Sequence, residues 1–187
     1  MDHTEFITQI NNIVPQNFIN KIIPLIDEKA KHDLGVGMGF NKSGIDKNRR
    51  DVKGYCLGDN KTPTNIFYWN FIKKEIERVY YFYKAKFPLM CSEVINQIDL
   101  LKYSKGGKYE VHTDHYSNTP RHLSIIINLN DNYEGGDLIF TDQQLKEIKR
   151  LKLGKGSVTF FPSNFMYPHS IQPITEGTRY SIVAWLQ

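Results

Sequence analysis

The chain has 187 residues, of which 40% are hydrophobic and 13% aromatic, and its formal net charge is +4 at pH 7. This length suits one domain over residues 1–187, and this composition supports a folded core, which excludes a wholly disordered chain. The longest unbroken apolar runs, such as 125–127, are far too short to cross a membrane. The N-terminus lacks a basic start followed by an apolar stretch, so we expect a cytoplasmic protein, in the host cytoplasm if its source is viral.

The net charge and the cysteine count argue against further classes of protein. A net charge of +4 is modest for this length and disfavours nucleic acid as the main partner. Two cysteines, Cys56 and Cys91, cannot form a disulfide framework or a four-thiolate metal site. We expect buried or incidental thiols in a reducing compartment, with one disulfide between them as the less favoured alternative.

The first half of the chain predicts helices and loops. Apolar residues recur with helical spacing over 15–31 and again over 64–87. Pro24 lies inside the first of these segments and predicts a kink or an early end. The glycine-rich segment 35–39 that follows predicts a mobile loop.

The segment 41–61 is polar and basic, which favours a solvated loop or a short hairpin. The alternative is a flap that closes over a bound partner, with Arg49 and Arg50 as its contacts. The two interpretations differ in whether removal of the segment would affect substrate turnover.

From residue 97 onward, short apolar or alternating runs follow one another with turn residues between them. This density of short strands predicts an all-β sandwich or barrel. Residues 142–155 are ambiguous between a helix and a hairpin. The expected strands are QIDLLKYS (97–104), KYEVHTDH (108–115), RHLSIIINLN (121–130), DLIFTD (137–142), GSVTFFPS (156–163), PHSIQPI (168–174) and TRYSIVAWLQ (178–187).

Two short motifs carry residues that could bind a metal ion. His112 and Asp114 lie two apart in an expected strand, so their side chains point to the same face. His169 could supply a third ligand from a distant strand. Two histidines and one carboxylate leave open positions opposite them, which suits non-haem Fe(II) better than a closed structural zinc site. His115 and His122 are rival ligands by position, and we place them on a loop or strand surface.

Arg179 follows His169 by ten residues, and we expect its strand to pair antiparallel with the His169 strand. The inward face of that strand would carry Arg179, Ser181, Val183 and Trp185. A buried guanidinium needs an anionic partner, and its planar fork binds a carboxylate through two contacts.

Taken in order, these motifs resemble the prolyl 4-hydroxylase-like branch of the Fe(II)/2-oxoglutarate-dependent dioxygenases. The similarity covers residues 98–187, whereas residues 1–97 match only in general character. The matching stretches are YSKGGKYEVHTD (103–114), RHLSIIINLN (121–130), YEGGDL (133–138), GSVTFF (156–161) and the run from His169 to Trp185.

The resemblance implies a mainly β fold, a double-stranded β-helix (jelly roll) with N-terminal α-helices packed outside. Residues 97–187 would form the jelly-roll core, and residues 1–96 the helical support and loops. The implied cofactors are Fe(II), 2-oxoglutarate as cosubstrate and O2, and the resemblance also admits ascorbate.

The resemblance also implies roles for individual residues. Fe(II) would be bound by His112, Asp114 and His169. Arg179 would bind the distal carboxylate of 2-oxoglutarate. Tyr103 would reach this cosubstrate through its hydroxyl, and Trp185 would form an aromatic wall near the iron.

Asn128 is a departure from the family pattern, because relatives frequently have tyrosine there and use its hydroxyl to bind the cosubstrate. Asparagine also donates hydrogen bonds but is shorter, so water or Ser124 could fill the gap. We expect Asn128 to contribute to cosubstrate binding.

The implied activity is hydroxylation of a prolyl residue in a peptide or protein, with succinate and CO2 as coproducts. The alternatives are a free amino acid, a lysyl residue or a small metabolite as substrate, or a non-catalytic jelly-roll binding module. The complete ligand set with Arg179 argues against the binding module. Trp185 stands where nucleobase demethylases have a second arginine, which argues against a nucleic acid substrate. Asp114 favours hydroxylation over halogenation, because halogenating relatives have a small residue there.

Overall fold

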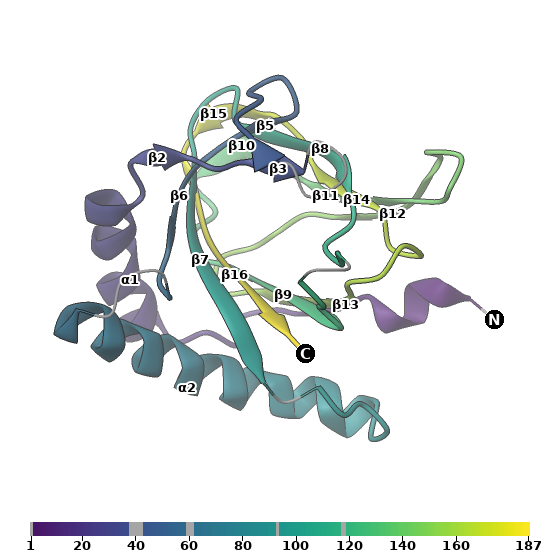
Figure 1. The fold of residues 1–187 in the computed structure, drawn as a ribbon, viewed down its shortest axis with the longest axis horizontal. Coiled ribbons are helices and arrows are strands. Elements are labelled where there is room, and N and C mark those ends of the chain that lie inside the picture. Colours follow the sequence, from purple (N-terminus) through teal and green to yellow (C-terminus); the bar gives the residue numbers. More distant parts are fainter. Residues whose placement is uncertain (1, 38–42, 59–61, 93, 117–118) are drawn as a thin grey trace.

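The computed structural model describes residues 2–37, 43–58, 62–92, 94–116 and 119–187. Two antiparallel sheets enclose an interior, and helices cover the outer face of the larger sheet (Figure 1). A short 3-10 helix, η1 (His3–Phe6), precedes the first strand.

The larger sheet runs through the middle of the fold. Its strands, in the order in which they pair, are β1 (Thr8–Ile10), β13 (Val158–Pro162), β9 (Leu123–Asn128), β16 (Arg179–Leu186), β7 (Ile95–Tyr103), β6 (Lys53–Cys56) and β2 (His32–Asp33).

The smaller sheet carries the expected metal ligands. Its strands, in pairing order, are β12 (Glu147–Leu151), β11 (Leu138–Thr141), β14 (His169–Ile171), β8 (Lys108–His112) and β5 (Arg50–Asp51). Two further strand pairs connect these elements. They are β10 (Tyr133–Gly135) with β15 (Ile174–Gly177), and β3 (Val36–Gly37) with β4 (Ser43–Gly44).

Two helices, α1 (Gln16–Lys29) and α2 (Pro63–Lys86), are found in the described part of the chain. The hydroxyl of Thr62 accepts a hydrogen bond from the Asn65 amide at 3.2 Å, which caps α2, and Pro63 occupies its first turn. α1 continues past Pro24 to Lys29, so the predicted early end does not occur. The buried face of α1, which includes Ile22 and Ile26, offsets the hydrogen bond that proline cannot donate.

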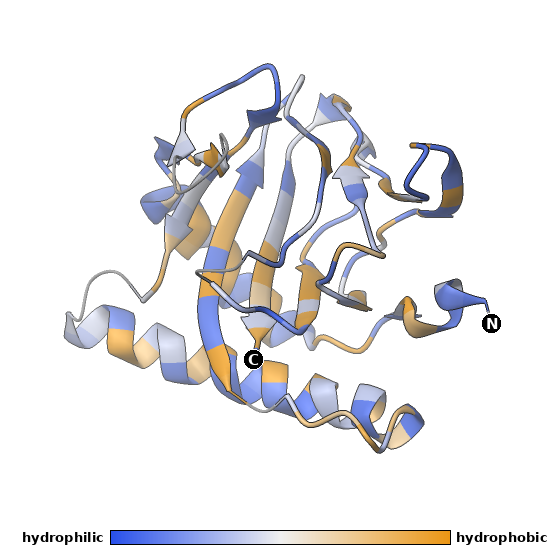
Figure 2. Ribbon diagram, turned by 45° about the vertical axis from the view of Figure 1, so that its right-hand side comes forward, coloured by the Kyte–Doolittle hydropathy of each residue, from blue (hydrophilic) through white to orange (hydrophobic). Residues whose placement is uncertain are grey.

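Alternate residues along the long strands serve two separate cores. One set, including Leu100, Ile125 and Ile182, packs against α1 and α2. The other set, including Leu101 and Val183, faces the interior between the sheets. Figure 2 shows hydrophobic residues on the long strands of the larger sheet and on both helices. Neither helix is long and apolar enough to span a membrane, as judged over the described residues.

The predicted mainly β architecture is confirmed, but one strand has different partners from those expected. β16 pairs with β7 and β9, and not with β14. The intervening β15 pairs with β10 and carries the chain from the smaller sheet to the larger one. The inward face of β16 is as predicted, since Val183 and Trp185 belong to the core between the sheets and Arg179 lies beside Tyr103 of the same core.

The polar segment 41–61 is built more deeply into the fold than its composition predicts. β6 lies beside β7 in the larger sheet, and the adjacent residues Val52 and Leu57 are buried. A solvated loop is therefore wrong for 50–57, because its few apolar residues are spaced to reach the core while Lys53 stays at the surface. Residues 41, 42 and 59–61 lie outside the described residues, as do 38 and 39 of the glycine-rich segment.

Two smaller expectations are also decided by the strand pairing. The glycine-rich segment contains β3, which pairs with β4, so part of the predicted loop is one strand of a short pair. The ambiguous segment 142–155 contains the turn and the second strand of a hairpin, because β12 pairs with the preceding β11. Neither Cys56 nor Cys91 takes part in a disulfide bond, so the less favoured alternative is wrong.

Candidate metal centre

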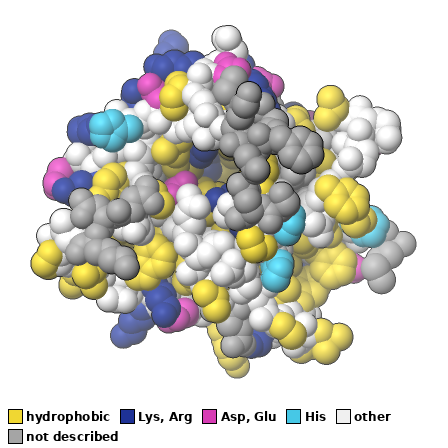
Figure 3. Space-filling model, in the orientation of Figure 1, with side chains coloured by type: hydrophobic (Ala, Val, Ile, Leu, Met, Phe, Trp, Pro, Cys, Tyr) yellow, Lys and Arg dark blue, Asp and Glu magenta, His cyan; other side chains and the backbone are white. Residues whose placement is uncertain are grey.

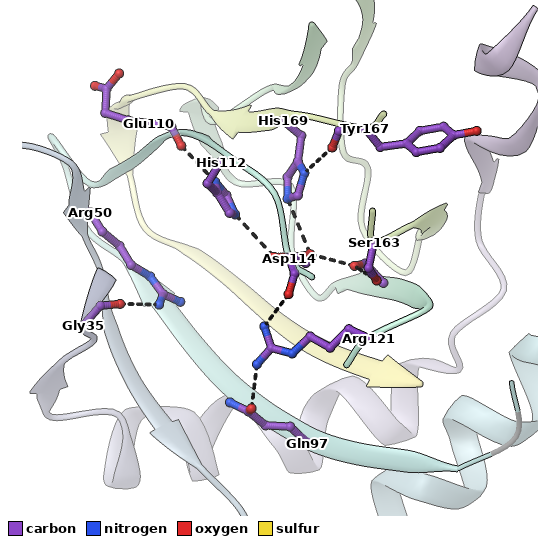
Figure 4. A network of polar contacts seen from close by, with 11 residues as sticks. Gly35, Arg50, Gln97, Glu110, His112, Asp114, Arg121, Ser163, Tyr167 and His169 are labelled. Carbon is purple, nitrogen blue, oxygen red and sulfur yellow. Dashed lines mark hydrogen bonds and ion pairs between the residues drawn. The ribbon is translucent and has the colours of Figure 1, made fainter. Parts of the chain in front are cut away.

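The three expected metal ligands meet inside the barrel, on the smaller sheet. β8 and β14 pair with His112 directly opposite His169, and Asp114 follows two residues after His112, just beyond the end of β8. One potential ligand atom from each residue lies within 4.8 Å of the others. Figure 4 shows the two imidazoles and the carboxylate converging on one point.

Each imidazole is oriented by its own strand. Nδ1 of His112 lies 2.9 Å from the carbonyl oxygen of Glu110, and Nδ1 of His169 lies 3.1 Å from that of Tyr167. A neutral ring donates its proton from Nδ1 to this carbonyl, so the lone pair of Nε2 is free. The two Nε2 atoms lie 3.5 and 3.6 Å from the oxygens of Asp114. The tautomer with its proton on Nδ1 is the one that lets Nε2 bind a metal ion.

Asp114 is held by a short chain of hydroxyls. The Ser124 hydroxyl donates to Oδ2 of Asp114 at 2.6 Å, and the Ser163 hydroxyl lies 2.8 Å from that of Ser124. Burial alone would raise the pKa of the Asp114 carboxyl, but His169, His112 and Ser124 outweigh it and hold this pKa well below its usual range. The carboxyl is therefore a carboxylate at neutral pH.

His169 remains uncharged at neutral pH. Burial is the main cause that lowers its pKa, and repulsion from His112 adds to it, so the pKa falls to about 4. A metal ion needs deprotonated ligands, and His169 and Asp114 both meet this requirement before any ion arrives.

Aromatic rings enclose the three ligands. The Tyr109 ring stacks on His112 with a centroid separation of 3.5 Å. The rings of Phe161 and Phe140 lie 4.6 and 5.8 Å from that of His169. These rings limit the access of water and lower the local dielectric.

Arg179 lies in the same interior and is 1% exposed. Its Nε donates to Oδ1 of Asn128 at 3.0 Å, and its guanidinium carbon lies 5.1 Å from the centroid of the Tyr103 ring. Its Nη1 is buried and has no hydrogen-bond partner among the described residues. A buried guanidinium nitrogen without a partner is costly, and a carboxylate is the ligand that would satisfy it.

The side-chain amide of Asn128 forms its hydrogen bonds with other groups of the protein. The amide nitrogen donates to the carbonyl oxygens of Asn130 at 2.6 Å, Leu153 at 2.9 Å and Gly154 at 3.3 Å. Its amide oxygen faces Arg179 and also accepts from the Tyr133 hydroxyl at 3.3 Å. The structure thus connects Asn128 to Arg179, and leaves the expected contact with a cosubstrate as a prediction.

Trp185 and Tyr103 both face this interior from the larger sheet. The Trp185 ring lies under the guanidinium of Arg121 at 3.7 Å, and its Nε1 is buried without a partner among the described residues. Tyr103 is buried, which raises the pKa of its hydroxyl, so this group is a neutral donor. Figure 3, which has the orientation of Figure 1, shows a hollow near the middle of the molecular surface, with basic and acidic side-chain atoms inside it.

Comparison with known proteins decides the family. Residues 98–187 match the family model described as the 2OG-Fe(II) oxygenase superfamily. The matching part of the chain, residues 98–187, belongs to this superfamily. Members of this superfamily use Fe(II), 2-oxoglutarate and O2, and the buried triad of the oxygenase could bind the metal.

Relatives of the oxygenase agree with the branch predicted from its motifs. It is 38% identical over 90 residues to a PKHD-type hydroxylase of Prochlorococcus marinus, and the aligned part is 46% of this chain and 39% of that relative. It is 25% identical over 186 residues to a PKHD-type hydroxylase of a Synechococcus strain, which covers 95% of this chain and 76% of that relative.

A solved structure gives the fold. The structure of a prolyl hydroxylase in complex with a hypoxia inducible factor oxygen degradation domain peptide fragment, from Trichoplax adhaerens, matches with a TM-score of 0.72. The identity is 18%, and the match covers 98% of this chain and 84% of that chain. It confirms the jelly-roll fold that the sequence predicts.

Some residues around the site of the oxygenase could not be predicted from the sequence. Tyr133 donates to the Leu153 carbonyl oxygen at 3.1 Å as well as to Asn128, and nothing local marks it for this position. Ser124, expected as a filler near the cosubstrate, instead binds Asp114. Period-two alternation places Ser124 on the correct strand face, but only the pairing of distant strands reveals its partner.

Proposed function

We propose that the oxygenase hydroxylates a prolyl residue of a peptide or protein, consuming 2-oxoglutarate and O2 and releasing succinate and CO2. The observation that carries the proposal is the buried triad of His112, Asp114 and His169, which shares one interior with the unpaired Nη1 of Arg179. The choice of a prolyl residue rests on its similarity to hydroxylases of the prolyl branch.

The residues of this interior fit the group they would hold. Two imidazoles and one carboxylate suit Fe(II) with open coordination positions. When bound, Fe(II) and 2-oxoglutarate supply the oxidising chemistry, and the protein supplies position and shielding. The Tyr109, Phe140 and Phe161 rings exclude water from the reacting centre.

Four residues would bind or position the cosubstrate and substrate. Arg179 would bind the distal carboxylate through Nη1, and Tyr103 would donate its neutral hydroxyl to the same molecule. Asn128 would act through Arg179, since its oxygen fixes the guanidinium by accepting from Nε at 3.0 Å. Trp185 would form the wall on the side where the substrate enters.

An anaerobic titration of the metal-free chain with Fe(II) and 2-oxoglutarate tests this proposal. We expect the weak visible charge-transfer band of the chelate to appear in the wild type and to be lost in His169→Ala. Proline-containing peptides are then incubated with the loaded enzyme in air, and hydroxylation is read by mass spectrometry. A folded wild-type chain that forms no band would overturn the oxygenase mechanism and favour the non-catalytic binding module.

A further inference from the structure

Two more arginines lie beside the metal ligands and are not needed for metal or cosubstrate. Arg50 is on β5, and Arg121 lies between β8 and β9. Figure 4 shows them extending from different elements into the space on one side of the triad. Their position at this interior raises the question of what they bind.

Arg121 is fixed by three groups of the protein. Its guanidinium stacks on Trp185 at 3.7 Å, Nη2 donates to Oε1 of Gln97 at 2.7 Å, and Nη1 donates to the Asp114 carbonyl oxygen at 3.3 Å. Its Nε is buried and has no partner among the described residues. The group is thus rigid, cationic and short of one acceptor.

Arg50 is fixed in a similar way from the other side. Its guanidinium carbon lies 4.5 Å from the centroid of the Tyr109 ring, which itself stacks on His112. Its Nη1 donates to the Gly35 carbonyl oxygen at 2.9 Å, and its Nε is buried without a partner in the part of the chain that the structure describes. Arg50 and Arg121 therefore each stack on a ring at this interior and each lack an acceptor.

One buried carboxylate, Asp99 on β7, lies near both arginines without neutralising them by contact. Both guanidinium groups influence its ionisation, yet among the described residues no basic group lies within 4 Å of its oxygens. Gln97 donates to its Oδ1 at 2.9 Å. Burial raises the pKa of Asp99, which further weakens it as a permanent counter-ion.

The balance of charge follows from these groups. This interior contains three guanidinium groups, those of Arg50, Arg121 and Arg179, and two carboxylates, those of Asp99 and Asp114. Fe(II) and the 2-oxoglutarate dianion cancel one another, so the loaded interior keeps an excess of positive charge. An acceptor with a negative charge would restore the balance, and a cationic group would be repelled at low dielectric.

We propose that Arg50 and Arg121 bind a carboxylate of the substrate, next to the residue that is hydroxylated. The carboxylate belongs to an acidic side chain of the peptide or to its C-terminus, and the same charges reject a lysyl side chain as the target. The inference rests on the proposed function, since it concerns the substrate of the same site.

Matched peptides test the proposal. Proline-containing peptides that differ only in the residue beside proline, Glu, Gln or Lys, are bound to the enzyme loaded with Mn(II) and 2-oxoglutarate, and each is made with a free and an amidated C-terminus. A carboxylate that accepts from two guanidinium groups should tighten binding by about tenfold or more over the isosteric amide. The Glu and free C-terminus arms distinguish the two sources of the carboxylate.

Variants assign the effect to the arginines. Arg50→Gln should reduce the preference for the carboxylate peptide to near unity, while Arg50→Lys, which keeps the charge, should retain part of it. Arg150→Gln on β12 is the matched control, because it makes the same change at an exposed arginine that pairs with Glu147 and Asp137. Thermal unfolding of each variant checks its fold.

Every outcome decides the proposal. Equal binding of all peptides, including no binding, a preference for the Lys peptide, or a preference that survives Arg50→Gln would each overturn it. The anaerobic chelate band of the wild type separates this failure from failure of the proposed function. If the band forms and peptides show no preference for a carboxylate, the oxygenase assignment stands and only the substrate class is refuted.

Discussion

Replacement of Arg179 by lysine separates charge from geometry at the cosubstrate site. Lysine keeps a positive charge but loses the planar fork. In the wild type, Nε of Arg179 is committed to Asn128 at 3.0 Å, which leaves the buried Nη1 as the nitrogen free for a ligand. A single ammonium group cannot replace both the hydrogen bond to Asn128 and the contact with the ligand.

The size of the effect follows from the bond that is lost. A hydrogen bond between charged groups contributes about 1.5–3 kcal/mol in a buried setting. This corresponds to a rise of about 10- to 150-fold in KM for 2-oxoglutarate, at about 1.4 kcal/mol for each factor of ten. The chemical step does not involve this carboxylate, so kcat should change much less than KM.

The assay compares two 2-oxo acids in the loaded enzyme. Consumption of 2-oxoglutarate gives kcat and KM for the wild type and Arg179→Lys. A 2-oxo acid of similar size that lacks the distal carboxylate serves as the control, and both enzymes should use it with similar, poor efficiency.

A loss of efficiency that is equal for the two 2-oxo acids would refute the reasoning. It would mean that Arg179 supports the barrel rather than a carboxylate. Thermal unfolding of the variant, with and without Fe(II), would then be expected to show the same loss of stability.

Three further predictions concern neighbouring groups. Ser124→Ala removes the 2.6 Å hydrogen bond to Asp114, and metal affinity should fall by about 10- to 100-fold in an equilibrium titration; unchanged affinity would show that Ser124 only fills space. Tyr133→Phe removes the hydrogen bond from Tyr133 to the Asn128 oxygen, which leaves Arg179 as the donor to that oxygen. Because Asn128 is then held less firmly beside Arg179, KM for 2-oxoglutarate should rise a few-fold without a change in kcat. A fall in kcat alone would contradict this positioning role of Tyr133. The metal-free chain should lose roughly 3 kcal/mol of stability as pH falls from 6.5 to 4, because unfolded His169 gains a proton that the folded residue, with a pKa of about 4, does not. Urea unfolding at several pH values measures this slope, which should be absent in His169→Ala.

The fold was predictable wherever local periodicity carries the signal. Short apolar or alternating runs located β7, β9 and β16 to within a few residues, since much of each strand is buried on both faces. The pairing of β16 was not predictable, because proximity in sequence favours a hairpin and the actual partners are set by the closure of two sheets. β6 was missed because its residues read as polar, although they lie in the larger sheet.

The candidate site, like the fold, could be predicted from the sequence only in part. The meeting of His112, Asp114 and His169 was predicted from residue types and from the order of several motifs along the chain, since each motif alone is weak evidence. The contacts around these residues could not be predicted, since Asn128 binds Arg179 across 51 positions of sequence and Arg121 stacks on Trp185 from a distant part of the chain. Those contacts arise only when strands far apart in the chain become neighbours.

The anchoring of each imidazole to a carbonyl two residues earlier has a consequence for metal selection. The ligands of the oxygenase are in place before an ion arrives, so binding requires little rearrangement of the chain. A preformed set of two imidazoles and a carboxylate does not discriminate strongly among divalent ions, and their affinities should follow the general order in which Co²⁺, Ni²⁺ and Zn²⁺ exceed Fe²⁺. The active fraction of the protein in a cell should therefore follow the supply of free iron relative to these competitors, and recombinant preparations should gain activity when competing ions are removed first.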